Sequence, residues 1–115
     1  MTVTIERPDA QIAHLIPSGL LDGEALQSEL VRAIGTAAAD GATRFVVDMH
    51  AFAMLDSSGL GALVAAHSEV AGISGARLVL TGITPTLRQT LSRAMLLQVL
   101  PVYETVERAI AALRR

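Results

Sequence analysis

The chain has no cysteine and few aromatic residues. Its 115 residues include two Phe, one Tyr and no Trp. Without cysteine the protein can form no disulfide, thiolate zinc site or cysteine nucleophile, and this composition suits a reducing cytosol. Hydrophobic residues make up 51% of the chain, but aromatic residues only 3%. We therefore expect a core built mainly from Leu, Val, Ile and Ala side chains.

The chain also lacks a strong excess of either charge. Nine basic and eleven acidic residues give a formal net charge of -2, and the scattered basic residues predict no direct contact with nucleic acid. Three dispersed histidines predict no metal site. No apolar run approaches the ~18 residues of a membrane span, and residues 1–8 do not resemble a secretory signal. We expect a cytoplasmic protein without membrane insertion.

Hydrophobic periodicity predicts one α/β domain over residues 1–115, with the element order ββαβαβαβα. A chain of this length should bury about two-thirds of its unfolded surface in one core. We expect a single mixed, mostly parallel sheet of about five strands, flanked by about four helices. The expected strands lie at 3–5, 12–16, 45–49, 77–81 and 98–103, and the expected helices at 23–39, 60–71, 85–95 and 106–113.

Individual residues predict where several elements begin and end. Pro17 cannot donate a ladder hydrogen bond, so the second strand should end there, bulge or lie at an edge. Asp22 and Thr84–Pro85 should start helices, and Asp40–Gly41 should end the first helix. The second and third helices should turn these apolar-stripe positions toward the core: Leu60, Leu63, Val64, His67, Ala71, Leu87, Leu91 and Met95.

Chemistry is concentrated in the hexapeptide DSSGLG, where a buried strand's loop turns into a helix. A helix start leaves backbone N–H groups without partners. Ser57 is the predicted N-cap, and Asp56 adds negative charge at the positive end of the helix dipole. Ser58 follows in the first turn, with its hydroxyl able to face solvent. Gly59 and Gly61 each cost about 1 kcal/mol of helix stability relative to alanine, but they permit close approach by another macromolecule.

Capping alone is the alternative interpretation of this segment. The two serines would then satisfy free amides, and the glycines would ease a tight turn between strand and helix. The same alternative applies to Asp22 and Asp56, because a carboxylate before a helix is most often an N-cap. In the functional interpretation both carboxylates lie on one rim of the sheet, orient Ser58 and meet a basic or amide-rich surface of a partner. The residues alone leave both interpretations open.

An enzymatic interpretation of Ser58 has little support. A nucleophile elbow requires Gly-x-Ser-x-Gly, but Asp56 occupies the position two residues before the serine. His14 and His67 fall on apolar stripes typical of core or rim histidines, and His50 is expected in a loop. No carboxylate is placed by the sequence to orient any of the three. We therefore expect no enzymatic activity.

Nucleotide binding is a minor alternative for the same helix start. Gly59-x-Gly61 could cradle a phosphate, but the segment lacks the lysine of a P-loop and the third glycine of a dinucleotide fingerprint. We otherwise expect no cofactor, and no feature of the sequence predicts an oligomeric state.

The hexapeptide at 56–61 resembles the signature of the STAS domain in bacterial anti-sigma factor antagonists. Gly19-Leu20-Leu21-Asp22 resembles the Gly-x-Leu-Asp element that follows the family's second strand, and residues 46–49 resemble its third strand. Residues 77–82, the helix that begins at Thr84–Pro85 and the helix at 106–113 match in the same order. The resemblance therefore covers essentially the whole chain.

The resemblance implies a protein-protein switch. In the family, an unphosphorylated antagonist binds an anti-sigma factor that is also a serine kinase, and a sigma factor is thereby released for transcription. Phosphorylation of the motif's second serine, here Ser58, blocks that binding, and a serine phosphatase would reverse it. The residues implied in partner contact are Asp22, Asp56, Ser57, Ser58, Gly59 and Gly61.

A different partner is compatible with the same fold. The chain would then be a STAS subunit of a membrane transport, lipid-trafficking or stress-signalling complex. The intact acceptor motif favours signalling. Pro17 and Gly23 depart from the family's commoner polar pattern around the end of the second strand, so the shape of the rim beside the motif cannot be inferred from the resemblance.

Overall fold

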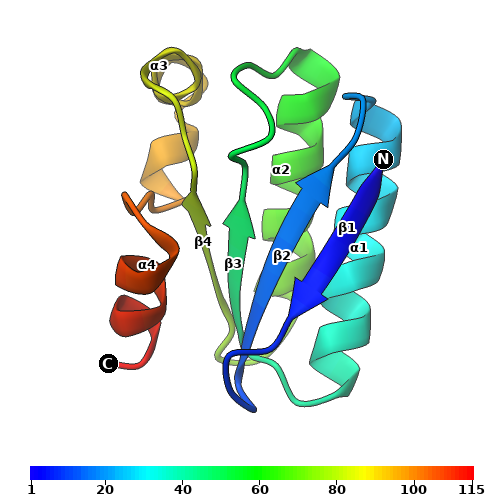
Figure 1. Cartoon of the computed structure of the whole chain (residues 1–115), viewed down its shortest axis with the longest axis vertical. Coiled ribbons are helices and arrows are strands. Elements are labelled where there is room, and N and C mark those ends of the chain that lie inside the picture. Colours follow the sequence, from blue (N-terminus) through cyan, green and yellow to red (C-terminus); the bar gives the residue numbers. More distant parts are fainter.

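One mixed sheet with helices on both faces forms the body of the protein (Figure 1). The computed structural model describes residues 1–115. The strands are β1 (Thr2–Glu6), β2 (Ile12–Ser18), β3 (Arg44–Asp48) and β4 (Arg77–Thr81), and the helices are α1 (Gly23–Ala39), α2 (Ser57–Ala71), α3 (Pro85–Arg93) and α4 (Val106–Leu113). A 3-10 turn, η1 (Leu96–Gln98), follows α3.

The sheet order is β1-β2-β3-β4. β1 runs antiparallel to β2, whereas β2, β3 and β4 are parallel. The predicted α/β class with a mixed, mostly parallel sheet is therefore confirmed. The carboxyl ends of the three parallel strands meet at one edge, the upper edge in Figure 1, and loops at such an edge commonly form binding sites.

The predicted fifth strand is reduced to one bridge between Leu80 and Val102. The Leu80 amide donates to the Pro101 carbonyl at 2.8 Å, and the Tyr103 amide donates to the Leu80 carbonyl at 2.9 Å. Pro101 has no N–H group to extend the ladder. Before it, Met95 has a left-handed φ of 62° and leads into η1. After η1, residues 99–103 therefore pair with β4 at a single bridge and do not form a full strand.

β3 buries both of its faces, since its successive side chains point to opposite sides of the sheet and helices cover both sides. Phe45 and Val47 belong to the larger core, which packs beneath α1 and α2, whereas Val46 belongs to a smaller core covered by α4. The nearly continuous apolar run at 45–49 was predicted to be an interior strand covered on both faces, and the structure confirms this.

Pro17 is accommodated inside β2 without breaking the strand. β2 continues to Ser18 and lies between β1 and β3, so the strand neither ends at Pro17 nor runs along the edge of the sheet. The parallel pairing with β3 stops at Leu15, however, and Pro17 pairs only with Val3 of β1. The prediction for Pro17 is therefore wrong: the strand can include a proline there because β3 no longer pairs with β2 at that position and requires no N–H donor.

The predicted inward faces of α2 and α3 need correction. Val64 is 44% exposed, and His67 and Ala71 also lie outside the core. The buried face of α2 consists instead of Gly59, Ala62, Leu63, Ala66 and Val70. These small residues let α2 pack against α1, so the neighbouring helix decides which face is buried. Leu87 and Leu91 are buried as predicted, whereas Met95 lies beyond the end of α3 and is exposed.

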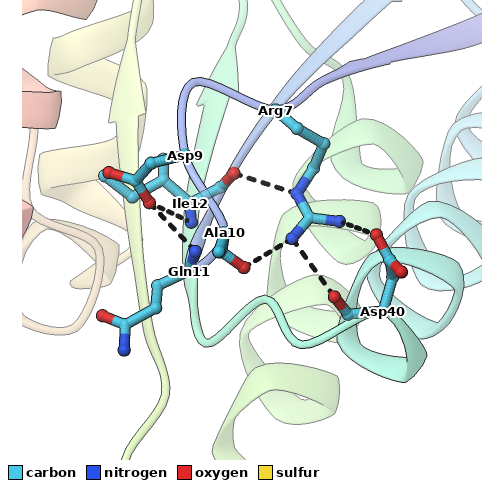
Figure 2. A network of polar contacts seen from close by, with 6 residues as sticks. All are labelled: Arg7, Asp9, Ala10, Gln11, Ile12 and Asp40. Atoms are coloured by element: carbon cyan, nitrogen blue, oxygen red, sulfur yellow. Dashed lines mark hydrogen bonds and ion pairs between the residues drawn. The ribbon is translucent and has the colours of Figure 1, made fainter.

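Arg7 fixes the other end of the sheet, at the turn between β1 and β2 (Figure 2). Its guanidinium donates to the Asp40 carboxylate at 2.8 Å, to the Ala10 carbonyl at 2.6 Å and to the Ile12 carbonyl at 3.1 Å. Asp40 caps the carboxyl end of α1, where a cation also interacts favourably with the helix dipole. Arg7 thereby joins the hairpin to the end of the first helix.

Gly82, which directly follows β4, provides a test of packing near the edge where the parallel strands end. It has φ +71°, and a Cβ there would lie 2.6 Å from the His50 amide nitrogen and 2.7 Å from the Asp48 carboxylate. Gly75 has nearly the same φ, +70°, but open space around it. We expect Gly82→Ala to lose about 1–3 kcal/mol of unfolding free energy more than Gly75→Ala, because only Gly82→Ala overpacks the site. Urea unfolding of both variants measures the difference, and equal losses would contradict it.

Candidate functional site

Three loops form the upper edge of the sheet: residues 19–22 after β2, 49–56 after β3 and 82–84 after β4. The loops after β3 and β4 are joined, because the Thr84 hydroxyl donates to the Ala53 carbonyl at 2.7 Å. The same hydroxyl oxygen accepts from the Leu87 amide and caps α3 as predicted. We call these three loops, together with the first turns of α1 and α2, the rim.

Asp56 is the N-cap of α2. Its Oδ1 accepts the Gly59 amide at 2.8 Å and the Ser58 hydroxyl at 2.8 Å. The prediction that Ser57 would be the cap is wrong, since Ser57 is the first residue of the helix and is exposed. A single carboxylate oxygen accepts both the Gly59 amide and the Ser58 hydroxyl. Asp56 therefore caps the helix and orients Ser58 at the same time.

These two hydrogen bonds also keep Asp56 ionised. The pKa of Asp56 is lowered, mainly by the Gly59 amide and next by the Ser58 hydroxyl, because both donate to the charged form. The hydroxyl of Ser58 is therefore held beside a negative charge. Ser58 is itself exposed, as its position in the first turn predicted.

Asp22 caps α1 as Asp56 caps α2. Its Oδ1 accepts the amides of Glu24 at 3.1 Å and Ala25 at 3.2 Å. The predicted capping role of Asp22 is confirmed. Its side chain is exposed on the rim, so capping leaves it facing solvent.

Gly23, the first residue of α1, lies directly against Ser58. A Cβ on Gly23 would contact Ser58 Oγ and would lie 2.5 Å from Ser58 Cβ and 2.6 Å from the Ser58 carbonyl carbon. Gly23 is also buried. The first turns of α1 and α2 therefore touch at this point. In the sequence, the only signal for Gly23 was the small residue that follows the cap Asp22.

The two glycines of the motif have different surroundings. Gly59 is buried, and a Cβ on it would lie 3.0 Å from Leu55 Cδ2, so this glycine makes room for a core side chain. Gly61 is exposed, and a Cβ there would meet nothing within 4 Å. Of the two, only Gly61 presents a bare surface to solvent.

Exposed apolar side chains occur in the loops beside Asp22 and Asp56. Leu20 is 91% exposed and Leu21 38%, in the loop after β2, and Met54 is 47% exposed in the loop after β3. Sequence reasoning treated Leu20 and Leu21 only as part of a family element. These two leucines lie outside any segment of helical or strand periodicity, and this position in the sequence could have indicated that they are exposed.

A separate polar cluster lies where β3 ends. Asp48 Oδ1 accepts the amide of His50 at 3.1 Å and lies 2.9 Å from its Nδ1, while Asp48 Oδ2 lies 3.3 Å from Nε2 of the buried His14. Burial raises the pKa of Asp48, but the hydrogen bonds from His50 outweigh this, and the pKa is lowered overall. His14 is therefore a hydrogen-bonded core histidine, as predicted, and His50 lies in a loop.

The sequence placed no carboxylate to orient a histidine, but in the structure Asp48 contacts both His14 and His50. The parallel pairing of β2 with β3 brings His14 to Asp48, which sequence spacing could not show. Asp48 and His50 are only two residues apart, so their contact is local. Neither histidine forms a hydrogen bond with Ser58, whose hydroxyl donates to Asp56. The structure therefore contains no serine–histidine pair at the motif.

At the start of α2 the Gly59 amide already donates to Asp56. No group of three or more His, Asp or Glu side chains is arranged to hold a metal ion. No helix has both the length and the apolar character needed to cross a bilayer.

The pKa of Asp56 predicts an acid dependence of stability. Because the folded pKa lies below the unfolded value, Asp56 stabilises the fold above about pH 4, and this contribution is lost as pH falls through the folded pKa. Asp56→Asn should therefore flatten the loss of unfolding free energy between about pH 5 and pH 2. Ser58→Ala, which removes only one of the two hydrogen bonds, should flatten it less. Urea titrations at several pH values test both variants, and an unchanged acid slope in Asp56→Asn would contradict the assignment.

Comparisons with known proteins agree with this fold. A sequence profile described as the STAS domain matches residues 13–109, whereas no curated protein matches the chain in a sequence search. An anti-sigma factor antagonist from Mycobacterium paratuberculosis is 29% identical, with 99% of this chain and 94% of that chain covered and a TM-score of 0.74.

The anti-sigma factor antagonist SpoIIAA has the same fold in both of its forms. Its unphosphorylated structure is 24% identical, with 98% of this chain and 96% of that chain covered and a TM-score of 0.76. The phosphorylated form of the Bacillus protein is 22% identical, with 98% and 100% covered and a TM-score of 0.70. The STAS profile extends over most of the chain, including the first turns of α1 and α2, and the chain belongs to the STAS domain family.

Proposed function

We propose that this chain is an anti-sigma factor antagonist switched at Ser58. In its unphosphorylated form it binds an anti-sigma factor that is also a serine kinase, and a sigma factor is released. The observation that carries the proposal is an exposed serine in the first turn of α2, whose hydroxyl lies 2.8 Å from Asp56. The Mycobacterium paratuberculosis relative, itself an anti-sigma factor antagonist, supports the same assignment. A serine phosphatase and a cytoplasmic location belong to this proposal.

The exposed hydroxyl suits phosphoryl transfer from a kinase. Ser58 Oγ attacks the γ-phosphorus of ATP held by the partner, and the bond to the β,γ-bridging oxygen breaks, so that ADP leaves. The hydroxyl proton passes to Asp56, which already accepts it in a hydrogen bond. In a loose transition state there is little covalent work for a base. An ionised carboxylate that mainly orients the hydroxyl is therefore sufficient.

Phosphorylation would change the charge at the centre of the rim. A phosphoserine adds about -1.5 to -2 charges, beside the ionised Asp56 and on the same rim as Asp22. Like-charge repulsion and desolvation of the phosphate then oppose docking of a partner. The positive end of the α2 dipole favours the phosphate within the free protein, so the modified chain stays folded. The switch therefore acts on binding.

The rim offers contact chemistry of two kinds. The carboxylates of Asp22 and Asp56 suit a basic or amide-rich partner surface, while Leu20 and Met54 supply exposed apolar side chains. Apolar anchors surrounded by polar groups are typical of protein interfaces. Gly61 adds a bare helix surface against which a partner can pack.

Substitution of the serine tests the switch. Ser58→Asp should bind the candidate anti-sigma kinase about 10- to 100-fold more weakly than the parent, because docking must desolvate a second carboxylate beside the ionised Asp56. Ser58→Ala should bind the kinase and accept no phosphate. Calorimetry measures binding, and mass spectrometry after incubation with kinase and ATP locates the phosphate. Ser68→Ala and Ser68→Asp are matched controls, because Ser68 is an exposed serine of the same helix outside the rim.

Two results would oppose the proposal. If Ser58→Asp binds as tightly as the parent chain, charge at Ser58 is not the switch. If the protein co-purifies with a membrane permease complex and Ser58 is never labelled, the transport alternative is favoured instead.

Leu20 tests the apolar part of the interface. Because its side chain is 91% exposed, Leu20→Ala should change the unfolding free energy by no more than about 0.5 kcal/mol. It should weaken binding of the anti-sigma kinase about tenfold, the loss typical of an interface anchor. Val99→Ala is the control, because Val99 is 46% exposed and lines a pocket outside the rim that also includes Arg77, at the amino end of β4. Equal affinities for Leu20→Ala and the parent chain would remove Leu20 from the interface.

A further inference from the structure

The Ser58 side chain is held from two sides. On one side its hydroxyl donates to Asp56 at 2.8 Å. On the other side lies the backbone of Gly23, close enough that any Cβ would overlap the serine side chain. The two contacts come from different helix starts, α1 and α2. Together they leave the serine one orientation in which the hydrogen bond and the packing are both satisfied.

Space, and not backbone conformation, requires glycine at residue 23. Its φ lies outside the left-handed range, unlike those of Gly19, Gly41, Gly75 and Gly82. Its amide and Cα form an ordinary first helical residue. A methyl group there would displace Ser58 from Asp56, push the first turns of α1 and α2 apart, or do both, because the Ser58 backbone lies within 2.6 Å of the Cβ position.

We propose that Gly23 is the positioning residue for the phosphate-accepting hydroxyl: its bare Cα and the Asp56 carboxylate together hold Ser58 in the orientation that a kinase must meet. The kinetic part of this inference rests on the proposed function, whereas the structural part does not. A misplacement of about 1 Å at a reacting atom can cost about 100-fold in rate. Gly23 thereby acts on the reaction through Ser58 without touching the phosphate.

The same contacts reject the phosphorylated side chain. A phosphate dianion has no proton to donate to Asp56, and the two negative groups repel each other. On the opposite side the backbone of Gly23 packs directly against the Ser58 side chain. The phosphoserine must therefore turn away from both groups toward solvent. This removes the contact between Ser58 Oγ and Gly23, next to the loop that carries Leu20 and Leu21.

Nuclear magnetic resonance tests the structural part without a partner. In the parent chain we expect nuclear Overhauser contacts from the Gly23 Hα protons to the Ser58 Hβ protons and a single Ser58 χ1 rotamer. In Gly23→Ala the carboxyl titration of Asp56 should move to higher pH, toward that of Ser58→Ala, because the hydroxyl leaves Oδ1. Gly35→Ala is the matched control on α1, where a Cβ meets nothing within 4 Å, and should titrate like the parent.

A parent chain in which Ser58 averages among rotamers, without contacts to Gly23, would overturn the inference even if Gly23→Ala failed to fold. So would a folded Gly23→Ala variant whose Asp56 titration and Ser58 rotamer match the parent.

Phosphorylation kinetics test the consequence. With a kinase that labels the parent chain, Gly23→Ala should lower kcat/KM for Ser58 by about 10- to 100-fold, while Gly35→Ala leaves it unchanged. Equal rates for Gly23→Ala and the parent would overturn the positioning role. A parent chain that no candidate kinase labels counts against the proposed function alone, because the resonance measurements involve no kinase.

Discussion

One carboxylate oxygen, Oδ1 of Asp56, begins the helix and holds the serine. It accepts the Gly59 amide and the Ser58 hydroxyl at the same distance, 2.8 Å. The start of α2 and the orientation of the exposed hydroxyl are therefore set by a single ionised group. Any change that removes its charge or moves it affects fold and site together, which explains why a capping role and a functional role could not be separated at this residue.

The close approach of α1 and α2 follows from the composition of the core. With few aromatic residues, the inner faces of the two helices carry small side chains, among them Ala33 and Ala37 of α1 and Ala62 and Ala66 of α2. Small residues let helix backbones lie near each other. At the first turns this approach continues until Gly23 touches Ser58. The geometry of the site is thus a consequence of how the core is filled.

The two ends of the sheet differ in how they are fixed. At one end Arg7 donates to three carbonyl groups and a carboxylate and ties the β1–β2 turn to α1 (Figure 2). At the other end the rim exposes Leu20, Met54 and Ser58 to solvent. A rim supported by capped helices and a paired sheet can present such groups without unfolding. This arrangement suits a protein whose partner contact changes while its fold does not.

The sequence by itself determined what depends on neighbours along the chain. Interactions within a few residues produce the caps at Asp22 and Thr84, the interior strand at 45–49 and the closeness of Asp56 to Ser58. Tertiary structure alone decided which face of α2 is buried, how His14 meets Asp48 and why residue 23 is glycine. Those features depend on side chains that become neighbours only after the strands pair and the helices pack. The spacing of residues along the chain does not indicate such contacts.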